Sequence, residues 1–310
     1  MRLHQIVQRA RRCLAGAPDV TASASPRQSA SQRLGVEVLE DRAVPAILGT
    51  AGGDVILVEY DGWTGSTNVF VNGALGGTIG PGGSDQVDAL NGNDVVIVKG
   101  LGPGVFLGID AGKDDDTILL CPDSRDLGNI QGYLGVGGSV GYDQLILNDS
   151  AWGGGDTYTI TAQTIQVAGL PSFTVGYGNL EYVQLTTGGG NDTVRVPSVA
   201  PGTAYFVDTG AGWDTFEYLI PNSSWKLDGL NHGTVDGVAT FANAENLTSG
   251  VGNDTFYFTT PGAGVSGIID GGLGVDGLNY LGNFPGAFVT LPSGPATATG
   301  GVANFEWWAL

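Results

Sequence analysis

Apolar and polar residues alternate along this chain in short segments, and each segment follows a glycine-rich stretch that ends in an aspartate. In Thr187–Val196, three glycines, an asparagine and Asp192 precede a threonine-valine-arginine-valine segment. Such segments are short, bounded by glycine and rich in β-branched or aromatic residues, which is typical of β-strands. The body of the chain has no helical periodicity of useful length. The pattern therefore predicts short strands joined by glycine-aspartate turns. Related stretches are Asn91–Val98, Thr209–Tyr218, Ser249–Phe258 and Gly271–Tyr280.

The aspartates of these turns recur at fixed distances, and the same two offsets, +16 and +22, occur three times. The sets that share these offsets are Asp94, Asp110 and Asp116, then Asp192, Asp208 and Asp214, and finally Asp254, Asp270 and Asp276. A longer offset, +62, relates Asp54 to Asp116. Because 62 is the sum of 22 and 40, we interpret the long period as three coils of roughly 21 residues, the third without its aspartate.

A repeat of this length is typical of solenoids. We therefore predict an all-β fold, a parallel β-solenoid related to the β-helix or β-roll, with successive coils stacked roughly 4.8 Å apart. The pattern is compatible with a three-faced helix and with a flatter, two-faced roll.

A second motif consists of asparagine, any residue and glutamate before an apolar segment. It occurs at Asn179–Val183, Asn243–Leu247 and Asn304–Trp308. In the first two copies a glycine-aspartate turn follows about ten residues after the glutamate. We therefore interpret this motif as the opening of a new unit.

Residues 1–45 do not share the repeat pattern. They hold seven of the twelve basic residues and a middle rich in serine, alanine and glutamine. We interpret this segment as a disordered or removed leader, and residues 46–310 as the repeat domain. Within that domain the offset from Asp156 to Asp192 is +36, where +40 would keep the period, so a register slip is expected there.

Charge narrows the classes of partner. Beyond residue 45 only five basic residues face 27 acidic ones. This balance argues against nucleic acid and against an anionic membrane surface as partners. No apolar run is long enough to span a bilayer. The cysteines, Cys13 and Cys121, are divided between leader and body, so a structural disulfide is not expected.

Calcium is the cation that this composition favours. It takes about six to eight oxygen ligands in flexible geometry, and glycine turns expose carbonyl oxygens while the nine aspartates supply negative charge. Asp208 with Asp214, and Asp270 with Asp276, bracket five-residue turns. The alternative is that the aspartates accept hydrogen bonds from turn amides without any metal. The sequence leaves both explanations open.

The turns resemble the calcium-binding nonapeptide of haemolysin-type, repeats-in-toxin proteins. Gly271–Asn279 matches it completely, whereas Thr187–Arg195, Thr209–Glu217 and Ser249–Tyr257 replace the first glycine by threonine or serine. The resemblance implies calcium between the turns of successive coils, held by aspartate carboxylates and turn carbonyls. Since the copies do not follow one another directly, we expect such a stack along a single edge.

Residues 36–45 resemble the leader with the sequence Leu-Glu-Asp-Arg near the amino terminus of many planctomycete exported and cell-surface proteins. Glu40, Asp41, Arg42 and Pro45 match it. The resemblance implies export or surface attachment. A short amphipathic helix ended by Pro45 is the alternative.

The sequence carries no nucleophile elbow, phosphate loop or zinc spacing. His232 lies between asparagine and glycine and is expected in an exposed loop. Repeating aspartates do not suit a catalytic carboxylate pair, which should occur once.

We therefore expect a non-enzymatic, secreted or cell-surface protein that acts as a surface, matrix or adhesion module. Its partners would be calcium ions and surface polysaccharide or cell-envelope proteins. The alternative is a protein that binds polysaccharide through Trp152, Trp213 and Trp225, or a polysaccharide lyase or glycoside hydrolase.

Overall fold

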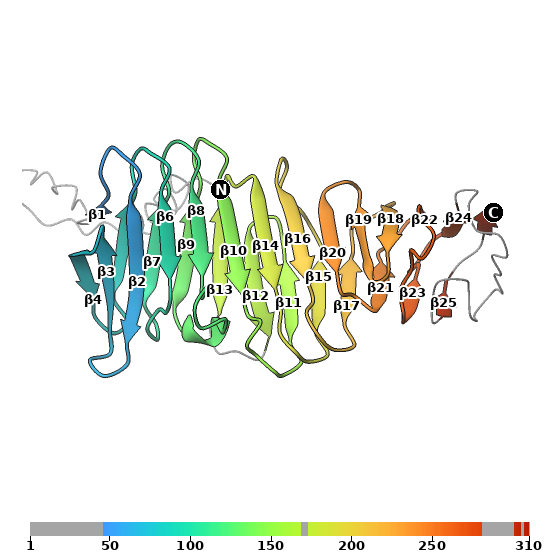
Figure 1. Cartoon of the computed structure of the whole chain (residues 1–310), viewed down its shortest axis with the longest axis horizontal. Coiled ribbons are helices and arrows are strands. Elements are labelled where there is room, and N and C mark those ends of the chain that lie inside the picture. Colours follow the sequence, from blue (N-terminus) through green and yellow to red (C-terminus); the bar gives the residue numbers. More distant parts are fainter. Residues whose placement is uncertain (1–45, 169–172, 281–300, 305–306, 310) are drawn as a thin grey trace, which may run out of the picture. The chain divides into compact units, whose positions relative to one another are not determined.

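The computed structural model describes residues 46–168, 173–280, 301–304 and 307–309, and they consist almost entirely of strands and turns. The strands form two large sheets, called sheet A and sheet B below (Figure 1). A short 3₁₀ helix, η2 (Leu127–Asn129), lies between β8 and β9. Within the described residues, no helix has the length and apolar character needed to cross a membrane.

Both sheets are built from strands of two to seven residues. Sheet A has the strand order β1 (Ile47–Leu48), β5 (Ser84–Asp88), β7 (Phe106–Asp110), β9 (Tyr133–Gly137), β13 (Thr174–Gly178), β12 (Thr164–Ala168), β11 (Thr157–Ile160), β15 (Thr193–Val196), β17 (Thr215–Tyr218), β21 (Asn246–Ser249), β23 (Ile268–Asp270) and β25 (Gly301–Ala303). Sheet B has the order β26 (Trp307–Ala309), β24 (Gly277–Tyr280), β22 (Thr255–Phe258), β18 (Ser224–Gly229), β19 (His232–Val235), β20 (Ala239–Ala242), β16 (Ala204–Asp208), β14 (Tyr182–Thr186), β10 (Gln144–Asn148), β8 (Thr117–Leu120), β6 (Val95–Val98), β2 (Val55–Asp61), β3 (Ser66–Val71) and β4 (Ala74–Ile79).

The chain passes alternately through the two sheets. β5 in sheet A leads to β6 in sheet B, and β7 and β8 then add the next strand to each sheet in parallel. Residues that face each other across these parallel pairs are 22 positions apart, as Val95 and Thr117 are. The same offset pairs Thr193 with Thr215. The predicted all-β fold with parallel strands is therefore confirmed, and the regular spacing of the aspartates corresponds to one strand step.

Three antiparallel meanders interrupt this alternation. They are β2–β3–β4 in sheet B, β11–β12–β13 in sheet A and β18–β19–β20 in sheet B. Val55 of β2 lies directly beside Val95 of β6, just as Asp54 contacts Asp94 across the same separation of 40 residues. The expectation that this long step contains two coils, one of them without an aspartate, is therefore wrong. β2 and β6 are instead direct neighbours in sheet B, and the meander β2–β3–β4 lies within the 40 residues between them.

The steps that contain the other two meanders are shorter than 40 residues. Thr157 pairs with Thr193 across 36 residues, and Ser224 pairs with Thr255 across 31 residues. The change of spacing between Asp156 and Asp192 thus coincides with the meander β11–β12–β13. Its smaller size accounts for the register slip.

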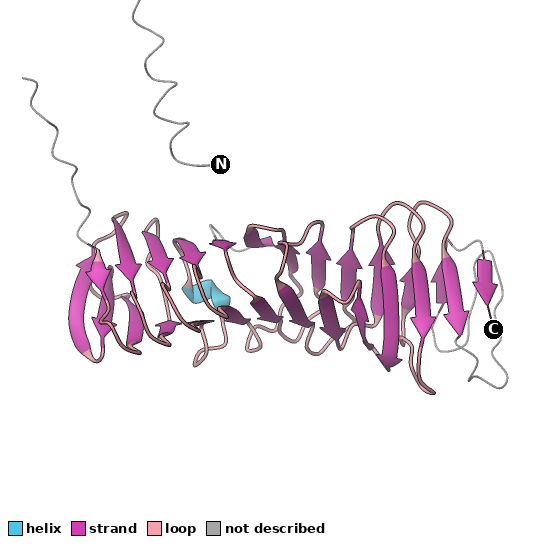
Figure 2. Cartoon of the chain, turned by 90° about the horizontal axis from the view of Figure 1, so that it is seen from above, coloured by secondary structure: helices cyan, strands magenta, loops and turns pink. Residues whose placement is uncertain are grey.

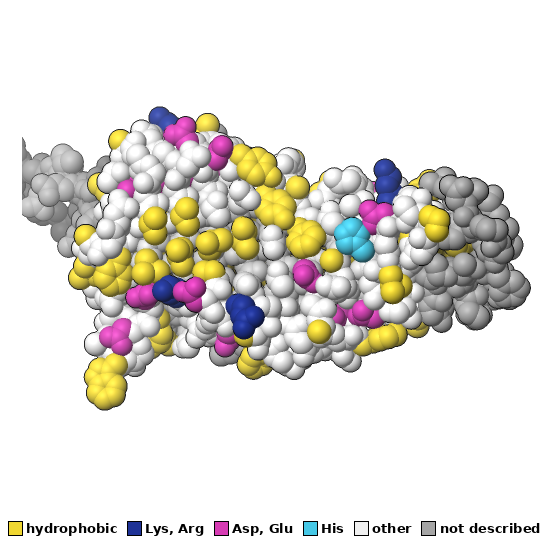
Figure 3. Space-filling view, viewed as in Figure 1, with side chains coloured by type: hydrophobic (Ala, Val, Ile, Leu, Met, Phe, Trp, Pro, Cys, Tyr) yellow, Lys and Arg dark blue, Asp and Glu magenta, His cyan; other side chains and the backbone are white. Residues whose placement is uncertain are grey.

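The core lies between the two sheets, which form two layers (Figure 2). Strand residues alternate between this core and the outside, so Ile56 and Val58 are fully buried while Leu57 faces outward. Near the third meander the core becomes aromatic. Trp225 is completely buried, with its ring stacked on Phe256 at a centroid distance of 4.9 Å. The outer face of sheet B also carries apolar side chains (Figure 3), including the register partners Leu57, Ile97, Leu119 and Ile146.

Candidate functional site

The candidate site consists of glycine-aspartate turns stacked on one another at the margins of the sheets. Glycine is needed in these turns for two reasons. Gly210 has a φ of 78°, in the left-handed region that disfavours side chains. A Cβ atom on Gly212 would lie 1.8 Å from the carbonyl oxygen of Gly190 in the neighbouring turn. The turns can therefore stack as closely as the strands they connect.

The turn aspartates form ladders across this stack. The backbone N–H of Asp94 donates to Oδ1 of Asp116 at 2.7 Å, and the backbone N–H of Asp192 donates to Oδ1 of Asp214 at 2.7 Å. Each carboxylate thus accepts from the equivalent residue of the preceding turn in the stack. The first ladder is Asp54, Asp94, Asp116, Asp143 and Glu181; the second is Asp156, Asp192, Asp214 and Glu245; the third contains Ser223, Asp254 and Asp276.

The asparagine-x-glutamate motif ends a ladder. Oε2 of Glu181 accepts from the backbone N–H of Asp143 at 2.7 Å, and Oε2 of Glu245 accepts from that of Asp214 at 2.8 Å. The asparagines Asn179 and Asn243 have φ values of 53° and 60°, which turn the chain sharply in place of the longer glycine turn. The interpretation of this motif as a unit opening missed this role. A glutamate at the position where the other turns have an aspartate is the sequence feature that could have indicated it.

The ladders lie on two margins. The first and third precede strands of sheet B, so they lie where the chain crosses from sheet A to sheet B. The second precedes strands of sheet A and lies on the opposite margin. Each ladder begins immediately before the first strand of a meander: β2, β11 or β18. The expectation of a stack along a single edge is therefore wrong.

Most ladder carboxylates have one oxygen without a hydrogen-bond partner. Among the described residues, seven ladder aspartates have a buried Oδ2 of this kind. They are Asp94, Asp116, Asp143, Asp156, Asp192, Asp214 and Asp254. Burying an ionised carboxylate without a partner is costly, so such a group takes up a proton or a cation.

The pKa values of ladder carboxyls reflect this environment. Burial, together with the adjacent carboxylates Asp143 and Asp94, raises the pKa of Asp116 to about 7. Burial and the neighbours Asp192 and Glu245 raise the pKa of Asp214 to about 6. In both cases the donated backbone N–H opposes the shift without reversing it.

Asp54 behaves in the opposite way. Burial works to raise its pKa, but hydrogen bonds from Thr50 and Asn72 to both carboxylate oxygens outweigh burial and lower it. Within one ladder, the pKa therefore depends on whether the second oxygen has a donor.

The structure divides the nine predicted aspartates into two sets. Six belong to the ladders: Asp94, Asp116, Asp192, Asp214, Asp254 and Asp276. The other three, Asp110, Asp208 and Asp270, lie outside them. Oδ1 of Asp208 accepts from the backbone N–H of Gly210 and from Nδ2 of Asn243. Oδ1 of Asp270 likewise accepts from Gly272 and Asn304. These two carboxylates have the turn-capping role of the non-metal alternative.

A cation at the ladders would need backbone oxygen atoms in addition to the carboxylates. In the described part of the chain, no group of three or more His, Cys, Asp or Glu side chains is arranged to hold a metal. Several turn carbonyls are already engaged, since Gly188 O accepts from the N–H of Ala211 at 3.1 Å. A calcium ion would therefore use the Oδ2 atoms with the remaining turn carbonyls.

Other predicted residues are placed differently. Trp152 and Trp213 are 39% and 52% exposed, whereas Trp225 is buried in the core and cannot contact a polysaccharide. Trp225 is thus a correction to the proposed aromatic set. His232 begins β19, and its Nδ1 lies 2.5 Å from Oδ1 of Asp228.

Comparison of the chain with protein-family models, curated proteins and solved structures found no match.

Proposed function

We propose that residues 46–310 form a β-solenoid and that the protein is a non-enzymatic repeat protein stabilised by calcium, exported to serve as a surface, matrix or adhesion module. The observation that carries this proposal is the row of buried Oδ2 atoms along the ladders. The same carboxylate environment recurs on coil after coil, as expected when many equivalent sites stabilise a repeat protein along its length. A catalytic pair would instead occur once.

Calcium suits these turns better than other common cations. It accepts carboxylate and carbonyl oxygens in irregular geometry, whereas magnesium requires a near-octahedral shell and retains water. Zinc favours nitrogen and sulfur ligands, which the ladder turns lack. Binding would also neutralise carboxylates that repel each other along a ladder. The acidic body and the leader resemblance support an exported location, where free calcium is abundant.

The test is a calcium titration of the full chain after removal of divalent ions by chelator. A ligand that binds only the folded state stabilises it by about 2.7 kcal/mol at a hundredfold excess over its Kd. We therefore expect calcium to raise the melting temperature by several degrees in scanning calorimetry, and magnesium to do so less. Asp116→Ala and Asp214→Ala should each reduce the calcium-dependent increase.

Asp228→Asn is the matched control, because Asp228 is an exposed carboxylate outside the ladders. This variant should keep the full calcium response. Equal melting temperatures in calcium and chelator would contradict calcium binding and leave protons as the neutralising species.

A further inference from the structure

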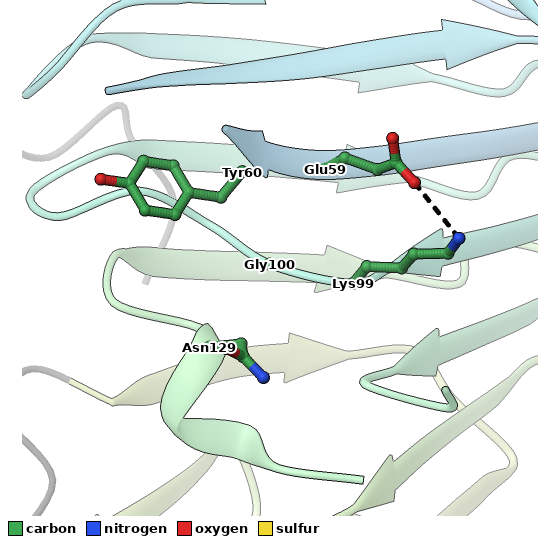
Figure 4. A pocket seen from close by; sticks show the side chains of 5 residues that line it. All are labelled: Glu59, Tyr60, Lys99, Gly100 and Asn129. Carbon is green, nitrogen blue, oxygen red and sulfur yellow. Dashed lines mark ion pairs between the residues drawn. The ribbon is translucent and has the colours of Figure 1, made fainter. Parts of the chain in front are cut away.

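A surface pocket of about 280 Å³ lies where β2 ends and the chain leaves β6. It is lined by Glu59, Tyr60, Lys99, Gly100 and Asn129 (Figure 4). The pocket lies at the carboxyl ends of these sheet B strands, on the margin opposite to the first ladder. No ladder residue contributes to its lining.

The pocket departs from the repeat. The strand step from β8 to β10 is 27 residues, against 22 residues for the step from β6 to β8. The extra length lies in the connection that contains η2, and Asn129 of η2 forms one wall (Figure 4). The neighbouring coil has Cys121 at the position that corresponds to Lys99, one residue beyond the paired strand ends. The lysine at position 99 is therefore not repeated at the equivalent position of the next strand of sheet B.

Hydrogen bonds hold this wall in place. Oδ1 of Asp126 accepts from the N–H of Gly128 at 2.8 Å and caps η2. Oδ1 of the buried Asp149 accepts from the N–H of Leu127 at 2.8 Å. The carbonyl oxygen of Asn129 accepts from the N–H of Leu101 at 3.0 Å. The pocket is thus preorganised, which lowers the entropic cost of binding.

Glycines make room for the aromatic ring of Tyr60. A Cβ atom on Gly102 would lie 2.9 Å from ring atoms of Tyr60, and one on Gly100 would lie 3.2 Å from its Cβ atom. A larger residue at either position would displace the tyrosine. The ring and the ion pair of Glu59 and Lys99 then lie on either side of Gly100 (Figure 4).

The charges of the pocket select a neutral ligand. Nζ of Lys99 lies 3.2 Å from Oε1 of Glu59 and 3.2 Å from Oδ2 of Asp123. Hydrogen bonds to these two carboxylates raise the pKa of Lys99, so the ammonium group stays protonated. Two carboxylates beside one ammonium disfavour a phosphate or an acidic sugar. Both carboxylates already pair with Lys99, so a cationic ligand would have to compete with its ammonium group. What fits is a molecule with hydroxyl groups that both donate and accept.

We propose that this pocket binds one sugar unit of a neutral polysaccharide. Adjacent hydroxyls can donate to Glu59 and accept from Lys99, and the Tyr60 ring offers an apolar surface to the C–H groups of the sugar. Nδ2 of Asn129 donates one N–H to the carbonyl oxygen of Asp126 at 3.0 Å, which leaves its second N–H for the ligand. The volume lies near the lower limit of the ~300–1,000 Å³ of pockets for drug-sized ligands, which suits a single sugar unit. The site is independent of calcium binding, because it shares no residue with the ladders.

The test is affinity electrophoresis of the full chain in gels containing soluble xylan, mixed-linkage glucan, galactomannan or dextran, with polygalacturonate as the acidic probe. We expect at least one neutral polysaccharide to retard the protein and polygalacturonate not to retard it. Lys99→Met and Tyr60→Ala should each weaken the retardation at least tenfold in apparent Kd. Equal melting temperatures would show that these variants are folded.

Two control variants distinguish binding in the pocket from nonspecific binding to the protein surface. Trp63→Ala removes an aromatic side chain that is 97% exposed, and Arg195→Met breaks an ion pair on sheet A. Both should bind like the wild type. The proposal is overturned if no neutral polysaccharide retards the protein, if only polygalacturonate does, or if Lys99→Met binds normally. Loss of binding in Trp63→Ala alone would place the site elsewhere and equally overturn it.

Discussion

At the scale of single residues, the central feature is a carboxylate whose two oxygens have different surroundings. Oδ1 of Asp116 accepts the backbone N–H of Asp94, while its buried Oδ2 has no hydrogen-bond partner. Asp54 begins the ladder, has donors from Thr50 and Asn72 on both oxygens, and its pKa shifts the other way. At Asp116, burial and the neighbouring carboxylates raise the pKa and therefore favour the protonated form in the metal-free protein.

This difference predicts how stability depends on pH in chelator. A carboxyl with a folded-state pKa of about 7, against an ordinary value of 3.8, binds its proton more tightly in the folded state. Its contribution is therefore fully present below pH ~4 and is lost as the pH rises through ~7. We expect the melting temperature without calcium to fall between about pH 4 and pH 7. Thermal unfolding followed by circular dichroism would measure it.

Asp116→Asn isolates this contribution, because asparagine keeps an oxygen for the N–H of Asp94 but does not titrate. The variant should show a shallower fall than the wild type between about pH 4 and pH 7. Asp61→Asn is the control, since hydrogen bonds from Thr64 and Trp63 lower the pKa of Asp61. A profile that is flat or rises with pH in the wild type would refute the assignment.

At the scale of elements, the ladders depend on the turns that begin and end them. Longer glycine turns bring an aspartate under its neighbour, but the short turn before β14 has only Asn179, Leu180 and Glu181 between the strands. Glutamate has one more methylene than aspartate, and it reaches the N–H of Asp143 from this shorter turn. The choice of acidic residue therefore follows the length of the turn.

Shortening the terminal side chain should expose this dependence. Glu245 accepts from the N–H of Asp214 and from Nδ2 of Asn231. Glu245→Asp should lose the contact with Asp214 and destabilise by about 1–3 kcal/mol, the cost of an unsatisfied buried donor. Glu245→Gln keeps an acceptor for Asp214 and should cost less. Urea denaturation would measure both.

Glu217→Asp serves as the matched control. Glu217 pairs with Arg195 on the outer face of sheet A. Because the Arg195 side chain is 49% exposed, loss of this ion pair should cost about 0.2–1 kcal/mol. Equal losses for Glu245→Asp and Glu245→Gln would show that charge, and not reach, governs the ladder end.

At the scale of the whole molecule, contacts join each strand to its neighbours in the same sheet. β8 pairs with β6 and β10, and β22 pairs with β18 and β24. Stability in such an array is close to a sum of coil and interface terms. A local defect should therefore remain local.

Hydrogen exchange tests this locality. Leu120 and Phe258 are fully buried in β8 and β22, and truncation of such residues costs about 2–5 kcal/mol. Leu120→Ala should speed exchange in β6, β8 and β10 and leave β22 to β24 unchanged. Phe258→Ala should have the converse effect. A uniform increase along the chain in either variant would contradict this account and indicate one cooperative unit.

The sequence by itself determined the local features of this protein. Glycine-aspartate turns, the strands after them and the regular strand step could be predicted because each depends on residues close together in the chain or on a simple repeat. The nine aspartates were found for the same reason, and six of them lie in the ladders. The lengths of the two longer steps, from Asp54 to Asp94 and from Asp156 to Asp192, could be read from the sequence. The meanders inside them could not, because the strands of a meander have the same residue preferences as the strands of a regular repeat.

Only the tertiary structure decided which segments lie side by side. The two margins of the ladders, the terminal role of Glu181 and Glu245, the burial of Trp225 and the pocket around Lys99 all depend on contacts between residues far apart in the chain. Local propensity carries no information about such pairings. They are set by the burial of both inner sheet faces and by hydrogen bonding of the stacked turns, which are properties of the assembled sheets.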